Sequence, residues 1–307
     1  MLSRLITQIL EHWLVLVCFA IIYIVWGSTY LFSSYALQQI PAFELCGYRY
    51  LIAGILLGLI TVLFYKPEMP SRLELRNACI AGFVFLGLGT GGAIWSLNYL
   101  DTGLTALIIS GEPLIILLML WVVNKKRPPR QAFWGIALAI VGAILLVSQD
   151  TLVSGSDQWT GVIVILTSML AWGMGSIFVS KVQLPASQGL NSSIQMLVGG
   201  VSTMVISLII REQGASFAVY TAWTWGSLAF LVIFGSVMAF TAFNYLLRTV
   251  STEKVVTNTY VNPVIAMFLG WSFNNEPLTQ LSILAALFML SGVFLINLSK
   301  GTKKASA

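Results

Sequence analysis

Glu112 is the one carboxylate that lies deep inside a long apolar stretch of this sequence. A charge in the hydrocarbon core of a membrane is costly, so an ionisable residue there is by default a functional residue. Glu112 could carry a proton or pair with the ammonium group of a solute. The alternatives are that it pairs with Arg49 or simply faces a water-filled cavity.

Arg49 is the one basic residue placed inside an apolar stretch, and it follows Glu44 by five residues. Residues five apart are poorly aligned on a helix, so a local salt bridge between these two is disfavoured. We expect the Arg49 side chain to reach the membrane interface or to tie two helices together. A role in gating or in carboxylate binding is the alternative.

Aromatic and hydroxyl side chains recur at helical spacing. Trp26, Tyr30 and Ser33 lie at i, i+4 and i+7 and therefore share one helix face. Trp172 and Ser176 repeat the first part of this pattern. Such a face predicts a moderately apolar cavity wall with a few hydrogen-bonding groups, although aromatic packing between helices would give the same pattern.

The full set of predicted substrate-binding residues is Trp26, Tyr30, Ser33, Trp95, Asn98, Glu112, Trp172, Ser176, Asn244, Tyr260 and Asn262. No metal or cofactor site is expected. The only histidine is His12, the three cysteines sit apart in apolar runs, and no phosphate-binding loop or H-E-x-x-H pattern is present. The run Gly87, Gly89 and Gly92 matches a dinucleotide fingerprint but lacks the strand that must precede it.

The amino-acid composition indicates which kind of secondary structure must position these residues. The 307 residues are 58% hydrophobic and 9% charged, with a mean hydropathy of +0.89, whereas ordinary globular domains have about 25% charged residues. Most of the surface must therefore face lipid, which excludes a soluble enzyme, a disulfide-framed secreted domain and a disordered tail. The expected fold is an all-α polytopic membrane protein with short loops.

Charges, prolines and loop residues divide the chain into ten expected transmembrane helices. These spans cover 13–35, 43–65, 78–98, 103–123, 131–149, 159–180, 190–210, 226–247, 255–274 and 280–299. Residues 1–12 are expected to form a short interfacial helix, and residues 300–307 a basic tail.

Lysine and arginine are distributed unevenly between the two sides of this arrangement. The even-numbered loops and both termini contain 14 of the 16, and the odd-numbered loops contain only Arg211. The positive-inside rule then places both termini in the cytoplasm. The basic charge accordingly indicates topology, and no nucleic-acid partner is expected.

The two halves of the chain share residues at a nearly constant offset. Trp26-Gly27 recurs as Trp172-Gly173 and Asn98-Tyr99 as Asn244-Tyr245, 146 residues later in each case, and Pro113 recurs as Pro263 after 150. This indicates a duplication, with one repeat over 13–149 and the other over 159–299. Five spans per repeat is an odd number, so the second copy should be inverted in the membrane, an architecture that suits alternating access.

Three further expectations follow from the paired positions. Pro113 and Pro263 should kink their spans near a binding site at the membrane midplane. Tyr99 and Tyr245 should lie near opposite mouths of the cavity and act as gates. Gly54 and Gly58 should allow close packing of two helices.

The chain resembles the EamA-type family of the drug/metabolite transporter superfamily over essentially its whole length. The resemblance rests on Trp26-Gly27-Ser28-Thr29, Arg49-Tyr50-Leu51-Ile52-Ala53-Gly54, Glu112-Pro113, Tyr260-Val261-Asn262-Pro263 and Asn275-Glu276-Pro277-Leu278. It implies ten helices in two inverted five-helix repeats, a central cavity and transport of small metabolites, often export of amino acids. Where the family commonly ends a span with Gly-Glu, the first repeat reads Asn124-Lys125-Lys126-Arg127, which weakens any role assigned to that acidic position.

We therefore expect an inner-membrane secondary transporter that exports amino acids or similar amphipathic solutes by proton coupling or exchange, with Glu112 as the proton-coupling candidate. A nucleotide-sugar exchanger is the alternative within carriers, disfavoured because phosphates require more cationic groups than Arg49 alone. A passive facilitator or channel is the alternative outside this class, and no ring of identical charges supports it. A monomer in the lipid bilayer is sufficient, and a dimer is compatible with the sequence.

Overall fold

The computed structural model describes residues 2–125, 130–147, 156–250, 252–255 and 258–298, and these are helical with short connections. Seven helical segments are long and apolar enough to cross a membrane: Trp13–Leu37, Ala42–Tyr65, Arg72–Ser96, Thr102–Val123, Asp157–Val179, Gln188–Ile210 and Ala222–Thr249. Three shorter apolar helices cover Phe133–Gly142, Val261–Phe273 and Gln280–Gly292. These three lie where the fifth, ninth and tenth spans are predicted. The polytopic α-helical fold is thus confirmed, and the arrangement as ten spans in inverted repeats stays a prediction.

In the first half the helices are α1 (Leu2–Leu37), α2 (Ala42–Ile60), η1 (Thr61–Tyr65), α3 (Arg72–Gly82), η2 (Phe83–Thr90), α4 (Gly91–Ser96), α5 (Thr102–Ile109), α6 (Glu112–Asn124) and α7 (Arg130–Val147). In the second half they are α8 (Ser156–Val179), α9 (Gln188–Ile210), η3 (Phe217–Val219), α10 (Ala222–Phe230), η4 (Leu231–Met238), α11 (Ala239–Thr249), α12 (Thr252–Val255), α13 (Asn258–Phe273) and α14 (Gln280–Leu298).

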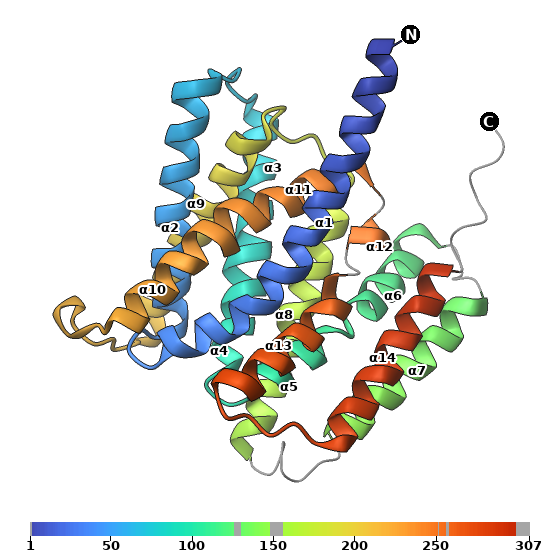
Figure 1. Ribbon diagram of the computed structural model, residues 1–307. Coiled ribbons are helices and arrows are strands. Elements are labelled where there is room, and N and C mark those ends of the chain that lie inside the picture. Colours follow the sequence, from blue (N-terminus) through green and yellow to red (C-terminus); the bar gives the residue numbers. More distant parts are fainter. Residues whose placement is uncertain (1, 126–129, 148–155, 251, 256–257, 299–307) are drawn as a thin grey trace.

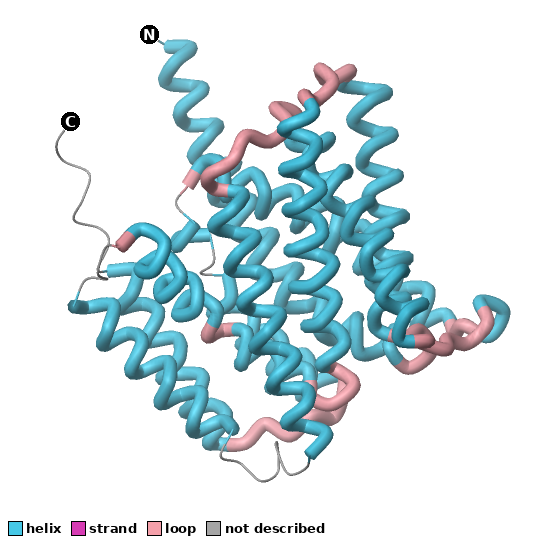
Figure 2. The backbone as a smooth tube through the Cα atoms, turned by 180° about the vertical axis from the view of Figure 1, so that it is seen from behind, coloured by secondary structure: helices cyan, strands magenta, loops and turns pink. Residues whose placement is uncertain are grey.

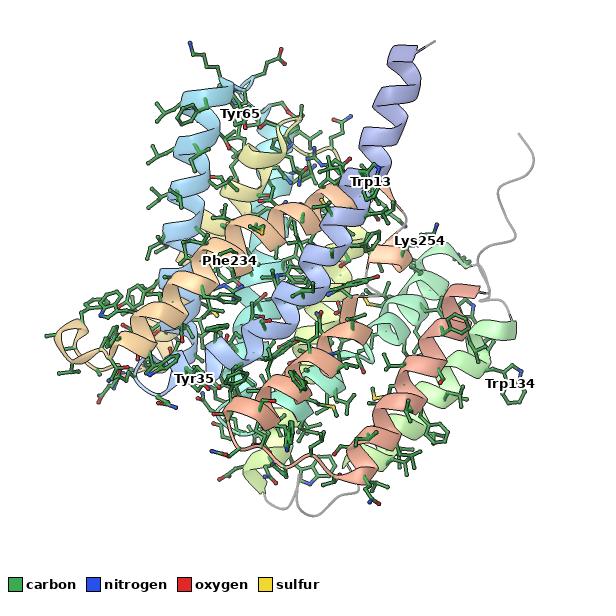
Figure 3. The ribbon with its side chains drawn as sticks, in the orientation of Figure 1. Trp13, Tyr35, Tyr65, Trp134, Phe234 and Lys254 are labelled. Atoms are coloured by element: carbon green, nitrogen blue, oxygen red, sulfur yellow. The ribbon has the colours of Figure 1, made fainter. Side chains whose placement is uncertain are left out.

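The helices form a bundle whose two ends differ in what they carry. The start of α1 and the end of α14 lie at one end, which we call the terminal end (Figure 1). The loops α1–α2, α9–α10 and α13–α14 lie at the opposite end, the far end. Figure 2 shows the same bundle from behind, with helices in cyan and most of the connecting loops in pink at its two ends. Trp134 projects from the outer surface of α7 (Figure 3) and is exposed, as expected for a side chain that faces lipid.

Residues 2–12 continue α1 without a break, so the predicted short N-terminal helix is the first part of one long helix. Its interfacial position stays a prediction. The predicted basic tail, residues 300–307, lies outside the described residues.

Four span ends share one backbone device. Lys66, Lys125, Arg211 and Asn275 have left-handed φ values of 41°, 54°, 56° and 53°, and each follows the last turn of a membrane helix. A left-handed residue after a helix turns the chain back, so that its own N–H group and the next one can donate to the last carbonyls of the helix. These residues therefore end the spans that the sequence places second, fourth, seventh and ninth.

Helices α2 and α9 bring the two halves of the chain into close backbone contact. A Cβ on Gly54 would stand 3.0 Å from the backbone nitrogen of Leu197, and a Cβ on Gly200 would stand 2.8 Å from that of Leu51. Both glycines and both leucines are separated by 146 residues. The two contacts are thus reciprocal, and the close packing expected at Gly54 is confirmed.

We predict that Gly54→Ala destabilises the protein by about 1–3 kcal/mol, because the added methyl group would force the α2 and α9 backbones apart. Gly226→Ala is the matched control. No atom lies within 4 Å of the Cβ that it would add, so the variant should be neutral or gain up to about 1 kcal/mol of helix propensity. Unfolding of the purified protein in detergent measures both, and equal stabilities would contradict this account of the interface.

Candidate functional site

The principal cavity lies at the centre of the bundle and is bounded by both halves of the chain. It leaves about 110 Å³ for the centres of water molecules, which is ample for a small solute or several waters. Its lining residues are Trp26, Thr29, Tyr30, Arg49, Tyr50, Leu86, Gly89, Thr90, Ala93, Ile94, Ile109, Glu112, Ser168, Met169, Trp172, Gly235, Phe240, Asn258 and Asn262. The wall is mostly aromatic and apolar with a few convergent polar groups, as is typical of a small-molecule site.

Two π-helical segments contribute to the wall from opposite halves. The segment η2 covers Phe83–Thr90 and η4 covers Leu231–Met238, each of eight residues. Longer helical turns of this kind widen a helix locally and occur frequently at functional sites. Gly89 and Gly235, which lie 146 residues apart, are the glycines that these segments present to the cavity.

Each of these glycines packs against a tryptophan from the other half. The indole Nε1 of Trp26 donates to the carbonyl of Gly235 at 3.1 Å. A Cβ on Gly89 would stand 3.1 Å from the Trp172 ring. Trp26 and Trp172 meet edge to face, with ring centroids 5.8 Å apart. The aromatic stripe predicted from the sequence is therefore the point at which the two halves meet around the cavity.

Glu112 occupies a break in the fourth predicted span. Helix α5 ends at Ile109, and α6 begins at Glu112 with Pro113 in its first turn, where a missing N–H is tolerated. Glu112 is 3% exposed and lines the cavity, and its Oε1 is buried without a hydrogen-bond partner. A buried acceptor with no partner is energetically unfavourable, so Oε1 is free to accept a hydrogen bond. Its counterpart Pro263 lies inside α13.

Arg49 is 4% exposed and lies in the cavity wall rather than at the membrane interface. Its Nε donates to Ser236 Oγ at 2.7 Å, and its guanidinium lies 5.0 Å from the centre of the Tyr50 ring. Arg49 thus ties α2 to η4, as one of the two interpretations from sequence expected. Snorkelling to the interface is excluded by its burial.

Asn262 links the cavity to α1. With its amide oriented to suit its neighbours, it donates to the carbonyl of Tyr23 at 2.8 Å and accepts from Asn258 Nδ2 at 3.1 Å. Both asparagines are buried and line the cavity.

Five of the predicted substrate-binding residues therefore line the cavity: Trp26, Tyr30, Glu112, Trp172 and Asn262. Five others lie outside the cavity, namely Ser33, Trp95, Asn98, Ser176 and Asn244. Ser33 and Ser176 are fully buried with hydroxyl groups that have no partner. Trp95 packs against Tyr99, with ring centroids 4.9 Å apart, and Asn98 is exposed in the following turn. The side chain of Tyr260 is outside the described part of the chain.

Asn244 belongs to a separate buried polar cluster. Its Nδ2 donates to Ser192 Oγ and to Gln195 Oε1, both at 3.2 Å, and Gln195 donates to Asn191 at 3.0 Å. This cluster joins α11 to α9 and does not reach the cavity. Tyr99 lies at the far end, after α4, and Tyr245 lies on α11; their gating role stays a prediction.

Sequence reasoning missed several lining residues, among them Thr29, Tyr50, Thr90, Gly235 and Asn258. Thr29 and Tyr50 lie within the segments that carry the family resemblance, which was a usable signal. Thr90 and Gly235 lie on the π-helical segments, which no sequence period revealed.

Known proteins match this chain over nearly its whole length. The EamA-like transporter family matches residues 13–148 and again residues 159–298. The chain belongs to this family. The uncharacterized inner membrane transporter YedA of Escherichia coli K12 is 32% identical over 281 residues, covering 91% of this chain and 89% of the relative. The uncharacterized transporter YvbV of Bacillus subtilis is 26% identical, covering 94% and 93%.

A solved crystal structure shares the fold, with a TM-score of 0.70 at 14% identity over 94% of this chain and 98% of the other. The protein is thus a polytopic membrane protein of a transporter family, with an amphipathic cavity between its two halves.

Proposed function

We propose that this protein is a secondary carrier of the inner membrane that exports small amphipathic metabolites such as amino acids. The observation that carries this proposal is the charge content of the cavity wall. Among the described residues that line it, Arg49 is the one cation and Glu112 the one carboxylate. A zwitterionic solute would place its carboxylate against the guanidinium and its ammonium group against Glu112, with its side chain among the aromatic rings.

The neighbours of Arg49 support this orientation of the solute. Because Ser236 holds Nε and the Tyr50 ring lies beside the guanidinium, the arginine is fixed before any ligand arrives. A preorganised donor binds a carboxylate with a smaller loss of side-chain entropy. A nucleotide sugar would bring two phosphates to this single guanidinium, which is a poorer match of charge.

We infer an alternating-access mechanism between two inverted repeats, with both termini in the cytoplasm. The two separate family matches, the reciprocal Gly54 and Gly200 contacts and the crossed tryptophan–glycine contacts support it. Similar halves that meet around one cavity can exchange two packings of nearly equal energy. Binding and transport then need no enzymatic chemistry and no cofactor.

Counterflow in proteoliposomes preloaded with single amino acids tests the proposal. A carrier should accumulate labelled tracer transiently above its equilibrium level for at least one of the twenty. Equilibration without such an overshoot, faster than in protein-free vesicles, would indicate a facilitator pore. The absence of any flux would contradict an amino-acid substrate.

Proton coupling would pass through Glu112, because its carboxylate is buried at the cavity and unpaired at Oε1. We predict that Glu112→Gln abolishes uptake driven by a pH gradient but spares counterflow at saturating solute, since exchange needs no net proton movement and the glutamine oxygen can still accept a hydrogen bond from the ammonium group. Thr105→Val is the control. Thr105 is fully buried outside the cavity with an unpaired hydroxyl, so its isosteric replacement should leave both activities intact.

Full pH-driven uptake by Glu112→Gln would rule out coupling through this residue. Loss of counterflow even at saturating solute would mean that the charge of Glu112 is required for solute binding itself, which would contradict a role confined to proton coupling.

A further inference from the structure

The far end of the bundle is held together by two carboxylates that reach from the second half of the chain to helix starts in the first. Glu212 follows α9 and accepts hydrogen bonds from the backbone nitrogens of Phe43 and Glu44, both at 3.1 Å. Glu276 follows α13 and accepts from the backbone nitrogens of Thr102 at 3.3 Å and Gly103 at 3.2 Å. Each carboxylate thus caps a membrane helix that belongs to the other half.

Local residues do not supply these caps. Helix α2 starts after Pro41, which has no side-chain acceptor, and the Asp101 carboxylate before α5 makes no capping hydrogen bond. The first N–H groups of a helix need acceptors, and an anion there also interacts favourably with the helix dipole. Loss of hydration, and then the negative charge of Glu276, raise the pKa of Asp101, consistent with two carboxylates that share the start of α5.

Residues around Glu212 and Glu276 help to hold the two carboxylates in place. The Thr102 hydroxyl group also donates a hydrogen bond to the Glu276 carboxylate, and its oxygen lies 2.6 Å and 2.7 Å from the two carboxylate oxygens. On α13, Gly270 leaves the room that Glu276 occupies, since a Cβ there would collide with Oε2. Gln39 joins the loops beside Glu212 through hydrogen bonds with Val219 and Thr221, at 2.9 Å and 2.8 Å. Tyr35, labelled near the far end in Figure 3, donates to the carbonyl of Phe273 at 2.9 Å.

The terminal end lacks the acidic residues at the equivalent positions. Glu212 and Glu276 each directly follow a left-handed residue, Arg211 and Asn275. The other two left-handed residues, Lys66 and Lys125, are followed in the sequence by Pro67 and Lys126. Neither proline nor lysine has a side-chain acceptor. Among the residues that the structure describes, these carboxylate caps between the halves therefore lie at the far end.

We propose that Glu212 and Glu276 form a paired latch that holds the far end closed and biases the carrier toward the state open at the terminal end. This rests on the proposed alternating access. To open the far end, the second half must withdraw both carboxylates and leave the starts of α2 and α5 uncapped. Opening of the terminal end breaks other contacts between the halves, such as the hydrogen bond from Asn77 Nδ2 to the carbonyl of Gln183 at 2.9 Å. It leaves α3 and α9 capped, because their own Ser71 and Ser187 accept from their first turns.

Cysteine labelling tests the latch. In a background without Cys18, Cys46 and Cys79, Ala93→Cys places a thiol in the cavity wall. A membrane-impermeant maleimide is added to one face of the membrane at a time, and exposed Gln38→Cys in the α1–α2 loop identifies the far face.

Glu212→Ala and Glu276→Ala should each raise the rate of far-face labelling about fivefold, the effect expected for the loss of one helix cap. The double variant should raise it further, and labelling from the terminal face should fall in parallel.

Glu74→Ala is the matched control, because Glu74 caps its own helix with Ser71 at the terminal end and makes no contact of the latch. Unchanged far-face labelling in the folded double variant would overturn the proposal. An equal rise in Glu74→Ala, or a rise from both faces at once, would also overturn it, since either would indicate general loosening. The labelling assay needs no substrate, so it tests the latch even if no amino acid gives counterflow.

Discussion

In a membrane, every backbone polar group must find its partner inside the protein, because lipid offers none. The bundle departs from regular α-helix at the points that define its cavity: η2, η4 and the break between α5 and α6. Each departure leaves backbone groups to be satisfied elsewhere. The carbonyl of Gly235 accepts from Trp26, and the starts of α2 and α5 are capped by Glu212 and Glu276. These contacts between the halves are thus partners for backbone groups, among them the first N–H groups of α2 and α5, which have no partner within their own helices.

The same constraint explains why the two cavity charges are held so differently. Arg49 has a fixed partner in Ser236 and an aromatic neighbour in Tyr50, so its position does not depend on a ligand. Glu112 retains an unpaired buried oxygen at the start of α6. A fixed cation and a carboxylate with an unpaired oxygen in the wall of one cavity are the basis of the proposed zwitterionic solute, whose apolar part the surrounding rings would accept.

Helical periodicity was sufficient to find Trp26, Tyr30 and Trp172, because the segments that carry them are regular. It failed at Ser33 and Ser176, which share the same helical spacing but are buried outside the cavity. Asn244 was predicted because the repeat pairs it with Asn98, and it instead lies in the polar cluster with Ser192 and Gln195 of α9. Arg49 was recognised as a buried charge, but its place in the cavity depends on Ser236, 187 residues away. The acceptors of the far-end caps are likewise tertiary contacts that no local pattern contains.

The central claim is that the two halves open one end of the bundle only when the other end closes. Pulsed dipolar distance measurements between spin labels test it most directly. One pair, at Gln38 and Gln280, spans the far end, and a second pair, at Glu68 and Ala186, spans the terminal end; all four residues are exposed. If the two ends open alternately, substrate should shift the two distance distributions in opposite directions. Distances that stay fixed at both ends, or that lengthen at both ends together, would contradict it.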